Sequence, residues 1–149
     1  MSPAAFIDAN VPIYAAGRDH PYKAPCGRLL IMAAEKPEAF VTNAEVFQEL
    51  LHRYVAIGRW PQGRNVVTRF ADLMAGRIEP LYSQDVLLAA DMANEHQRVS
   101  PRDLVHAAVM FRIQVHHIIS ADRDFDRVPG IARLDPLQLE EWQNSVMGS

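Results

Sequence analysis

The sequence predicts a single α/β domain: a three-layer α/β/α sandwich with a central, mainly parallel sheet of four to five strands. Short apolar runs predict strands that are buried on both faces. Segments with apolar residues at helical spacing separate these runs, and such alternation favours parallel pairing with right-handed crossovers. The chain has 149 residues, of which 49% are hydrophobic and 22% charged. This size and composition fit one domain, residues 1–149, with its own core.

The first elements lie before residue 42. The apolar run at residues 4–7 predicts a strand. Asn10 has the side chain of a helix N-cap, and Pro12 is tolerated in the first turn of a short helix. Apolar residues at helical spacing predict a second helix over residues 22–34, and residues 39–41 form a second strand.

Two further helices are predicted in the middle of the chain. Thr42 and Glu45 have the spacing of a capping box, Thr-x-x-Glu, which opens a helix that ends near Gly58. A second helix begins at Trp60 and stops at Gly76.

A third strand, over residues 78–82, is expected at an edge of the sheet because Pro80 removes a backbone donor. Ser83 is expected to cap the next helix. Ser100 is expected to cap the one after it, which has Pro101 at its first position.

The last elements are two strands and a helix. Ile118 and Ile119 form a buried strand that runs into Ser120, and another strand covers residues 131–134. Asp135 is expected to cap the closing helix.

Composition excludes several kinds of protein. Cys26 is the only cysteine, which excludes an internal disulfide and a multi-cysteine zinc site. The six histidines show no metalloprotease spacing. No basic leader and no long apolar stretch occur, so the sequence predicts a cytoplasmic protein without a membrane segment.

The net charge of −3 argues against a protein that binds nucleic acid by overall charge alone. However, residues 50–71 contain no Asp or Glu but four arginines, Arg53, Arg59, Arg64 and Arg69. Two interpretations remain open: a solvated helical hairpin whose arginines pair with acids elsewhere, or a patch that faces phosphates beside an acidic site.

Four carboxylates lie where this fold can bring them together. Asp8 follows the first strand and Asp122 follows the strand at Ile118, while Glu49 and Asp103 lie early in two helices. Carboxylates held at short range repel one another, and a divalent cation relieves that repulsion. An all-oxygen ligand set suits Mg²⁺, which can activate a water for attack on a phosphodiester.

Simpler roles exist for two of the four. Asp8 could cap the helix that follows it, and Asp103 fits a capping position at its own helix. Glu49 has no capping role, because Glu45 already takes the capping-box position. It is therefore the better ligand candidate.

Three aspartates follow the strand at Ile118. Asp122 lies nearest to the strand end and is expected to be the metal ligand. Asp124 is expected to point to solvent, and Asp126 is a weaker candidate for a further ligand.

Four motifs, in this order and spacing, resemble the PIN-domain family and are most similar to the VapC-type toxins of toxin–antitoxin pairs. The motifs are Phe6-Ile7-Asp8-Ala9-Asn10-Val11, Glu49-Leu50, Asp103-Leu104-Val105-His106-Ala107-Ala108 and Ser120-Ala121-Asp122-Arg123-Asp124-Phe125. The likeness extends over essentially the whole chain.

The resemblance implies an endoribonuclease that depends on Mg²⁺ or Mn²⁺. Its acidic residues would be Asp8, Glu49, Asp103 and Asp122. The resemblance also implies a homodimer that is silenced by a cognate VapB-like antitoxin.

The resemblance assigns further residues to the same pocket. Asn10 and Ser120 would line it, with Ser120 at a position where many relatives have threonine, and Asp126 matches an additional acid. The arginines Arg53, Arg59 and Arg64 are candidates for contacting the RNA backbone. His106 matches a frequent family residue, but its apolar helix face favours a packing role.

Two alternatives remain. One is a PIN-like RNA-processing protein, or a scaffold that binds RNA without cutting it. The other is a phosphatase of the haloacid-dehalogenase type with Asp8 as nucleophile, which is disfavoured because the only lysines, Lys23 and Lys36, both lie early in the chain. A nucleotide-binding loop is excluded because the glycine spacing at residues 58–63 continues with Arg64-Asn65.

Overall fold

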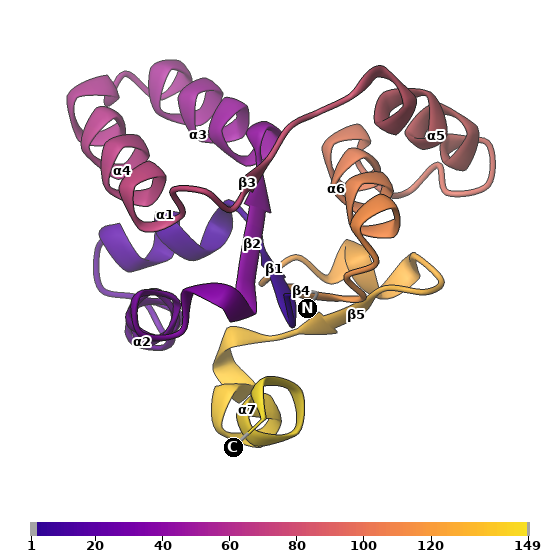
Figure 1. The fold of residues 1–149 in the computed structure, drawn as a ribbon. Helices are drawn as coiled ribbons and strands as arrows, with labels where there is room; N and C mark the ends of the chain where they lie inside the picture. The colour runs from indigo at the N-terminus through magenta and orange to yellow at the C-terminus, as the bar shows by residue number, and fades with distance from the viewer. Residues whose placement is uncertain (1–2, 149) are drawn as a thin grey trace.

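The computed structural model describes residues 3–148 and shows a five-stranded sheet between layers of helices (Figure 1). All four neighbouring strand pairs are parallel, and the strand order is β3-β2-β1-β4-β5. The predicted fold class is therefore confirmed. The strands are β1 (Ala5–Ile7), β2 (Phe40–Asn43), β3 (Ile78–Glu79), β4 (His117–Ile119) and β5 (Ala132–Leu134).

Helices connect every pair of consecutive strands except β4 and β5, which are joined by a 3-10 turn. The α-helices are α1 (Asn10–Ala16), α2 (Lys23–Glu35), α3 (Ala44–Ala56), α4 (Trp60–Leu73), α5 (Ser83–Ala93), α6 (Pro101–Ile113) and α7 (Leu139–Met147). Three 3-10 turns, η1 (Pro37–Ala39), η2 (Arg123–Arg127) and η3 (Pro136–Gln138), complete the described elements.

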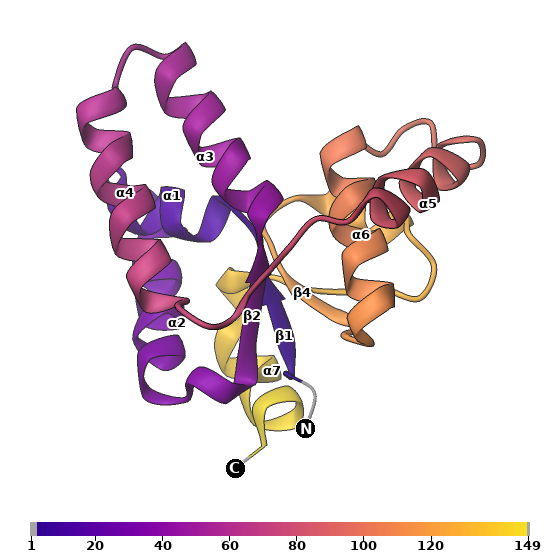
Figure 2. The same cartoon turned by 45° about the horizontal axis from the view of Figure 1, so that its top comes forward.

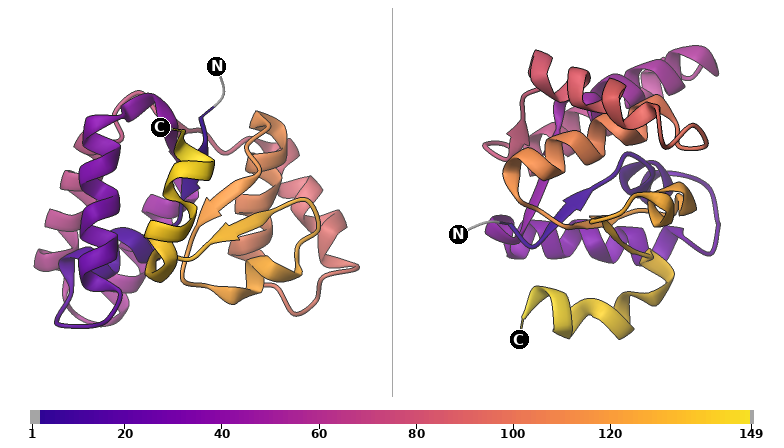
Figure 3. Two further views of the ribbon diagram at one scale, coloured as in Figure 1. Left: turned by 90° about the horizontal axis from the view of Figure 1, so that it is seen from below. Right: turned by 90° about the vertical axis from the view of Figure 1, so that its right-hand side faces the viewer.

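The helices cover both faces of the sheet. Helices α5 and α6 lie on one face, and α1, α2 and α7 lie on the other (Figures 1 and 3). Helix α3 leaves the end of β2 and extends away from the sheet, and α4 returns beside it (Figure 2) to contact α1 and α2. No helix within residues 3–148 is both long and apolar enough to cross a membrane.

The strand order makes β1 the central strand and places the topological switch point between β1 and β4. The chain runs outward from β1 through β2 to β3, crosses the sheet through α5 and α6, and resumes at β4 on the other side of β1. Loops diverge at the carboxyl ends of two such strands, and open α/β sheets bind ligands there. Asp8 and Ser120 directly follow these two strands.

The central strands are continuous hydrophobic runs because both of their faces are buried. Phe6, Ile7, Ile118 and Ile119 are completely buried because helices cover both faces of the sheet. The parallel register continues past the strands, since the Asp8 amide donates to the Ile119 carbonyl at 3.2 Å.

Arg112 on α6 anchors the crossover that returns the chain to β4. Its guanidinium donates to Asp85 Oδ1 at 2.9 Å and to Glu79 Oε1 at 3.2 Å. It also lies 4.6 Å from the centre of the Tyr82 ring. Because Arg112 contacts both β3 and the start of α5, it fixes this connection against α6.

Two predicted helix caps are wrong by one residue. Asn43, not Thr42, caps α3 by accepting from the Val46 amide at 3.0 Å. The Thr42 hydroxyl instead donates to the Ile7 carbonyl at 2.9 Å, which ties β2 to β1. Likewise Tyr82, not Ser83, is the N-cap residue of α5.

Asn10 does not cap a helix either. It is the first residue of α1, and Ala9 occupies the N-cap position without a side-chain bond. The Asn10 side chain is engaged across the sheet edge instead, as described below.

Gly63 permits the close approach of α4 to α3. A Cβ atom at this position would overlap Cβ and Cγ of Tyr54. We expect Gly63→Ala to lower the free energy of unfolding by about 1–3 kcal/mol, the usual cost of overpacking. Urea denaturation of the metal-free protein measures this change.

Gly27→Ala is the matched control, because no atom beyond its own helix backbone and its chain neighbours lies within 4 Å of a Cβ at Gly27 in α2. Its free energy of unfolding should rise by about 0.5–1 kcal/mol, because alanine loses less backbone entropy than glycine when a helix forms. Equal stability of Gly63→Ala and the parent would contradict the close contact between α3 and α4.

Candidate metal centre

Asp8 lies at the carboxyl end of β1, where three groups bind its carboxylate. Oδ1 accepts from the Ala9 amide at 2.7 Å. Oδ2 accepts from the Ser120 hydroxyl at 2.7 Å and from the Asn10 amide group at 3.2 Å. Asp8 is only 3% exposed, and these bonds hold its carboxylate in one orientation.

Ser120 joins the two central strands at this edge. Its Oγ donates to Asp8 and accepts both from Asn10 Nδ2 at 3.0 Å and from the Asp122 amide at 2.9 Å. All the bonding capacity of the hydroxyl is therefore used. Asn10 Oδ1 accepts from the Ala121 amide at 3.2 Å, so the loop after β4 is tied to α1.

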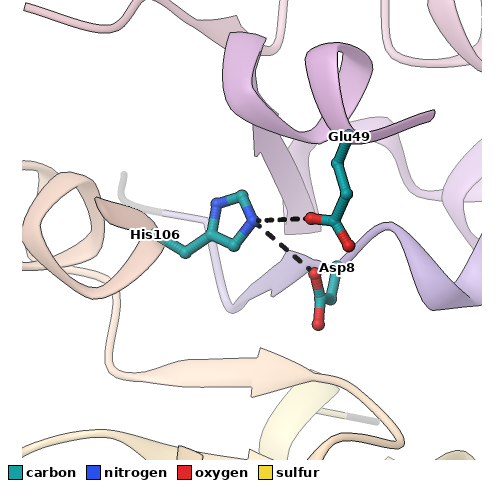
Figure 4. Close-up of side chains that lie close together, drawn as sticks. All are labelled: Asp8, Glu49 and His106. Atoms are coloured by element: carbon teal, nitrogen blue, oxygen red, sulfur yellow. Dashed lines mark hydrogen bonds and ion pairs between the residues drawn. The ribbon is translucent and has the colours of Figure 1, made fainter. Parts of the chain in front are cut away.

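His106 connects Asp8 to Glu49 of α3 (Figure 4). Its Nε2 lies 3.4 Å from Glu49 Oε1 and 3.7 Å from Asp8 Oδ1, and the ring is completely buried. These three residues come from α6, α3 and the end of β1. One side-chain atom from each lies within 4.8 Å of the others.

Asn43 determines which nitrogen of His106 carries the proton. Asn43 Oδ1 is occupied by the Val46 amide, so its NH₂ group faces His106 Nδ1 at 3.1 Å. Because the Asn43 NH₂ group donates to Nδ1, Nδ1 is the acceptor, and in the neutral ring the proton is on Nε2. In this form His106 donates toward Glu49 and Asp8.

Asp103, Asp122 and Asp124 form a second group of carboxylates. One oxygen from each lies within 4.8 Å of the others. The amide of Asp103 donates to the N-cap residue Ser100 at 3.2 Å, so its carboxylate is not the cap. The amide of Asp124 donates to Asp122 Oδ1 at 2.9 Å, which folds the loop after β4 around Asp122.

The two groups share one electrostatic environment. Burial, a hydrogen bond to Asp122 and the charges of Asp8, Asp122 and Glu49 raise the pKa of Asp103 to about 9. Burial also raises the pKa of Asp8, an effect that the charge of Glu49 increases and His106 opposes. The four carboxylates expected from the sequence thus lie close enough to affect one another.

The residues present fit a divalent cation. Asp103 Oδ2 is a buried oxygen without a hydrogen-bond partner among the described residues. Such an oxygen is costly unless it is protonated or binds a cation. The surrounding donors are carboxylate oxygens, which hard divalent ions prefer. Asp8, Glu49, Asp103, Asp122 and Asp124 are the side chains that could hold it.

The structure ranks the late aspartates differently from the sequence analysis. Asp126 was the weaker ligand candidate, but both of its oxygens accept from Arg133, at 3.1 and 3.3 Å. Arg133 also donates to the Ser120 carbonyl at 3.1 Å. Asp124, which was expected to face solvent, lies in the acidic group. Its Oδ1 also accepts from Arg127 at 2.6 Å.

The three predicted RNA-contacting arginines do not form one group. Arg53 and Arg59 line a common pocket with Arg18, whereas Arg64 is exposed on α4 and does not line that pocket.

Asn43 was not predicted as part of the site, and His106 was expected to have only a packing role. His106 does face the core, as its apolar helix face suggests, and its ring centroid lies 5.3 Å from that of Phe6, with the two rings tilted by 48°. The sequence does contain a signal for Asn43, because it is a polar residue at the end of a buried strand and at the start of a helix.

Comparison with known proteins identifies a family. The family model "PIN domain" matches residues 5–131. Ribonuclease VapC13 of Mycobacterium tuberculosis is 40% identical over 131 residues, which cover 86% of this chain and 97% of that protein. Ribonuclease VapC23 of the same species is 37% identical over 117 residues, which cover 78% of this chain and 91% of that protein.

Solved structures share the fold at low sequence identity. VapBC2 from Rickettsia felis, bound to a promoter DNA fragment, matches with a TM-score of 0.67 and 14% identity over 88% of this chain and 98% of that chain. VapC20 of Mycobacterium tuberculosis, described as a sarcin–ricin loop cleaving toxin, has a TM-score of 0.64 and 20% identity over 83% and 93% of the two chains.

The raised pKa of Asp103 predicts how stability depends on pH. The carboxyl titrates near 3.8 when unperturbed and at about 9 in the fold, so the folded protein holds a proton that the unfolded chain releases. This contribution to the stability of the metal-free protein is lost as pH rises from about 4 to about 9. We expect Asp103→Asn to flatten that decline and to be more stable than the parent at pH 8.

Thermal unfolding of the metal-free protein between pH 5 and pH 8.5 measures this effect. Asp91→Asn, an exposed acid on α5, is the control and should keep the slope of the parent. Addition of Mg²⁺ or Mn²⁺ at pH 8 should raise the melting temperature of the parent more than that of Asp103→Asn. Parallel pH curves for the parent and Asp103→Asn would contradict the assignment.

Proposed function

Because the chain belongs to the PIN-domain family, we propose that it is a VapC-type endoribonuclease, the toxin of a toxin–antitoxin pair, and that it depends on Mg²⁺ or Mn²⁺. The observation that carries the proposal is that Asp8, Glu49 and Asp122, from three other parts of the chain, lie close enough to raise the pKa of Asp103, whose buried Oδ2 has no hydrogen-bond partner among residues 3–148. The relatives named VapC ribonucleases support the substrate class.

The cation would be held by Asp8, Asp103 and Asp122, with Glu49 holding the metal or its water. When bound, a divalent cation lowers the pKa of water and neutralises charge on a phosphodiester. Asp124 is a better candidate than Asp126 for an additional ligand, since Asp126 is paired with Arg133.

The remaining residues of the centre orient these carboxylates. Ser120 and Asn10 hold Asp8 through hydrogen bonds of 2.7 and 3.2 Å. His106, held by Asn43, directs its Nε2 proton toward Glu49 and Asp8. These hydrogen bonds orient Asp8 and Glu49 despite the repulsion among the carboxylates.

The proposed partners follow from the family. We propose a homodimer that is inhibited by a cognate VapB-like antitoxin and acts on RNA in the cytoplasm. The solved neighbours with VapBC and FitAB names share only the fold with this chain, so they support the architecture of such a complex and not its details.

Cleavage of RNA tests the catalytic part of the proposal. With Mg²⁺ or Mn²⁺, the purified protein should cut structured RNAs, and chelator should abolish cutting. Asp8→Asn and Asp122→Asn should each lose at least about a hundredfold in rate, because each removes a charged ligand from the centre. Binding of Mn²⁺, followed by electron paramagnetic resonance, should weaken in the same two variants.

The control for this experiment is Asp91→Asn, which changes the same net charge on the exposed side of α5. It should retain the activity of the parent. Cleavage that persists in chelator, or full activity in both Asp8→Asn and Asp122→Asn, would overturn the mechanism. Metal-dependent RNA binding without any cleavage would favour the alternative of a non-cleaving scaffold.

Growth of bacteria tests the proposed toxin role. Induced expression of the parent chain should arrest growth, whereas expression of Asp122→Asn to the same level should not, because the arrest requires cleavage. Co-expression of the protein encoded by a small adjacent reading frame should restore growth. Unaffected growth with an active, folded enzyme would leave a ribonuclease that is not a toxin.

A further inference from the structure

We propose that Arg18, Arg53 and Arg59 form a subsite that binds a backbone phosphate of the RNA beside the metal centre. This inference rests on the ribonuclease function proposed above. It differs from the grouping expected from the sequence, because Arg18 joins the site and Arg64 does not.

The three arginines line a pocket of about 240 Å³ between α1, α3 and the turn that leads into α4. Arg18 follows the end of α1, Arg53 lies in the last turn of α3, and Arg59 precedes α4. Gln62 lines the same pocket and adds an amide that can donate hydrogen bonds. Pockets of this composition suit a small polar anion.

Negative charge is missing from this pocket. Its lining residues include no Asp or Glu within the described part of the chain. The arginine ion pairs found among residues 3–148 are formed by Arg28, Arg112, Arg127 and Arg133, and none involves an arginine of the pocket. The hairpin interpretation, in which Arg53 and Arg59 pair with acids elsewhere, is therefore not supported by the structure.

Helices α3 and α1 each contribute residues to both the pocket and the metal centre. Arg53 follows Glu49 by four residues on α3, so the two side chains are neighbours on one helix face, about 6 Å apart along its axis. On α1, Asn10 belongs to the metal centre and Ile13, one turn later, lines the pocket. An RNA strand whose scissile phosphate lies at the carboxylates would place a neighbouring backbone phosphate at the pocket.

Electrostatics favours a polyanion as the occupant. A chain with a net charge of −3 and a cluster of carboxylates at its centre repels RNA unless cations lie along the path of the backbone. Guanidinium groups bind phosphate through paired hydrogen bonds, which lysine cannot form. An acidic segment of a partner protein is the competing occupant, and the experiment below includes it.

Binding of RNA to the metal-free protein tests the inference without requiring cleavage. We expect Arg53→Gln and Arg59→Gln to weaken the binding of a short single-stranded RNA by about three- to tenfold each in chelator, measured by fluorescence anisotropy. The slope of log affinity against log salt should fall by about 0.7 for each lost contact. Arg18→Gln should behave in the same way.

The control is Arg28→Gln, which removes one positive charge from an exposed position on α2 where Arg28 pairs with Glu140 at 3.7 Å. It should leave the RNA affinity within about twofold, because Arg28 does not line the pocket and the variant changes only the overall charge. Circular dichroism melting of each variant confirms that the fold is retained.

RNA with a single neutral methylphosphonate linkage tests direct contact. One linkage near the cleavage site should weaken binding to the parent, and the same substitution should have a smaller effect on the double variant Arg53→Gln/Arg59→Gln, in which only Arg18 remains. Additive losses, unchanged RNA affinity in the arginine variants, or variants that lose binding only to an acidic peptide would overturn the inference. Failure of the parent to cleave any RNA with metal would instead contradict the proposed function.

Discussion

The concentration of carboxylates at the centre of the sheet is the constraint that organises this molecule. Asp8 and Asp103 are buried, and Glu49 and Asp122 lie close enough to raise the pKa of Asp103. Hydrogen-bond donors hold the carboxylates of Asp8 and Glu49 in place despite this repulsion. Ser120, Asn10 and His106 supply these donors. The fold thus holds carboxylates in an unfavourable electrostatic arrangement that a divalent cation can relieve.

The sheet provides the rigidity that this arrangement needs. Parallel pairing of β1 with β4 brings Asp8 and Ser120 to the same edge, and the 2.7 Å hydrogen bond between them fixes the two loops to each other. Arg133 on β5 secures the far side of the same loop through Ser120 and Asp126. A shift of either strand by one residue would reverse the side chains and dismantle the centre.

Much of the architecture could be predicted from the sequence because it depends on patterns with a fixed period. Buried apolar runs and helical spacing indicated the strands and helices, and acids at strand ends indicated the edge at which Asp8 and Asp122 meet. What could not be predicted depends on contacts across the chain. Asn43 caps α3 because Thr42 is used to bind the Ile7 carbonyl, and Asp126 is removed from the acidic group because Arg133 lies on the adjacent strand. Neither the Thr42–Ile7 hydrogen bond nor the pairing of Asp126 with Arg133 has a local signature in the sequence.

The strand order also has a consequence for the timing of synthesis. Asp8 and Glu49 belong to the half of the sheet that the ribosome makes first, but β4 inserts beside β1 only after some seventy further residues from Glu49 have been added. A nascent chain therefore contains part of the acidic centre long before Ser120 and Asp122 exist to complete it. With this topology the acidic centre is complete only after β4 has paired with β1, which is late in the synthesis of the domain.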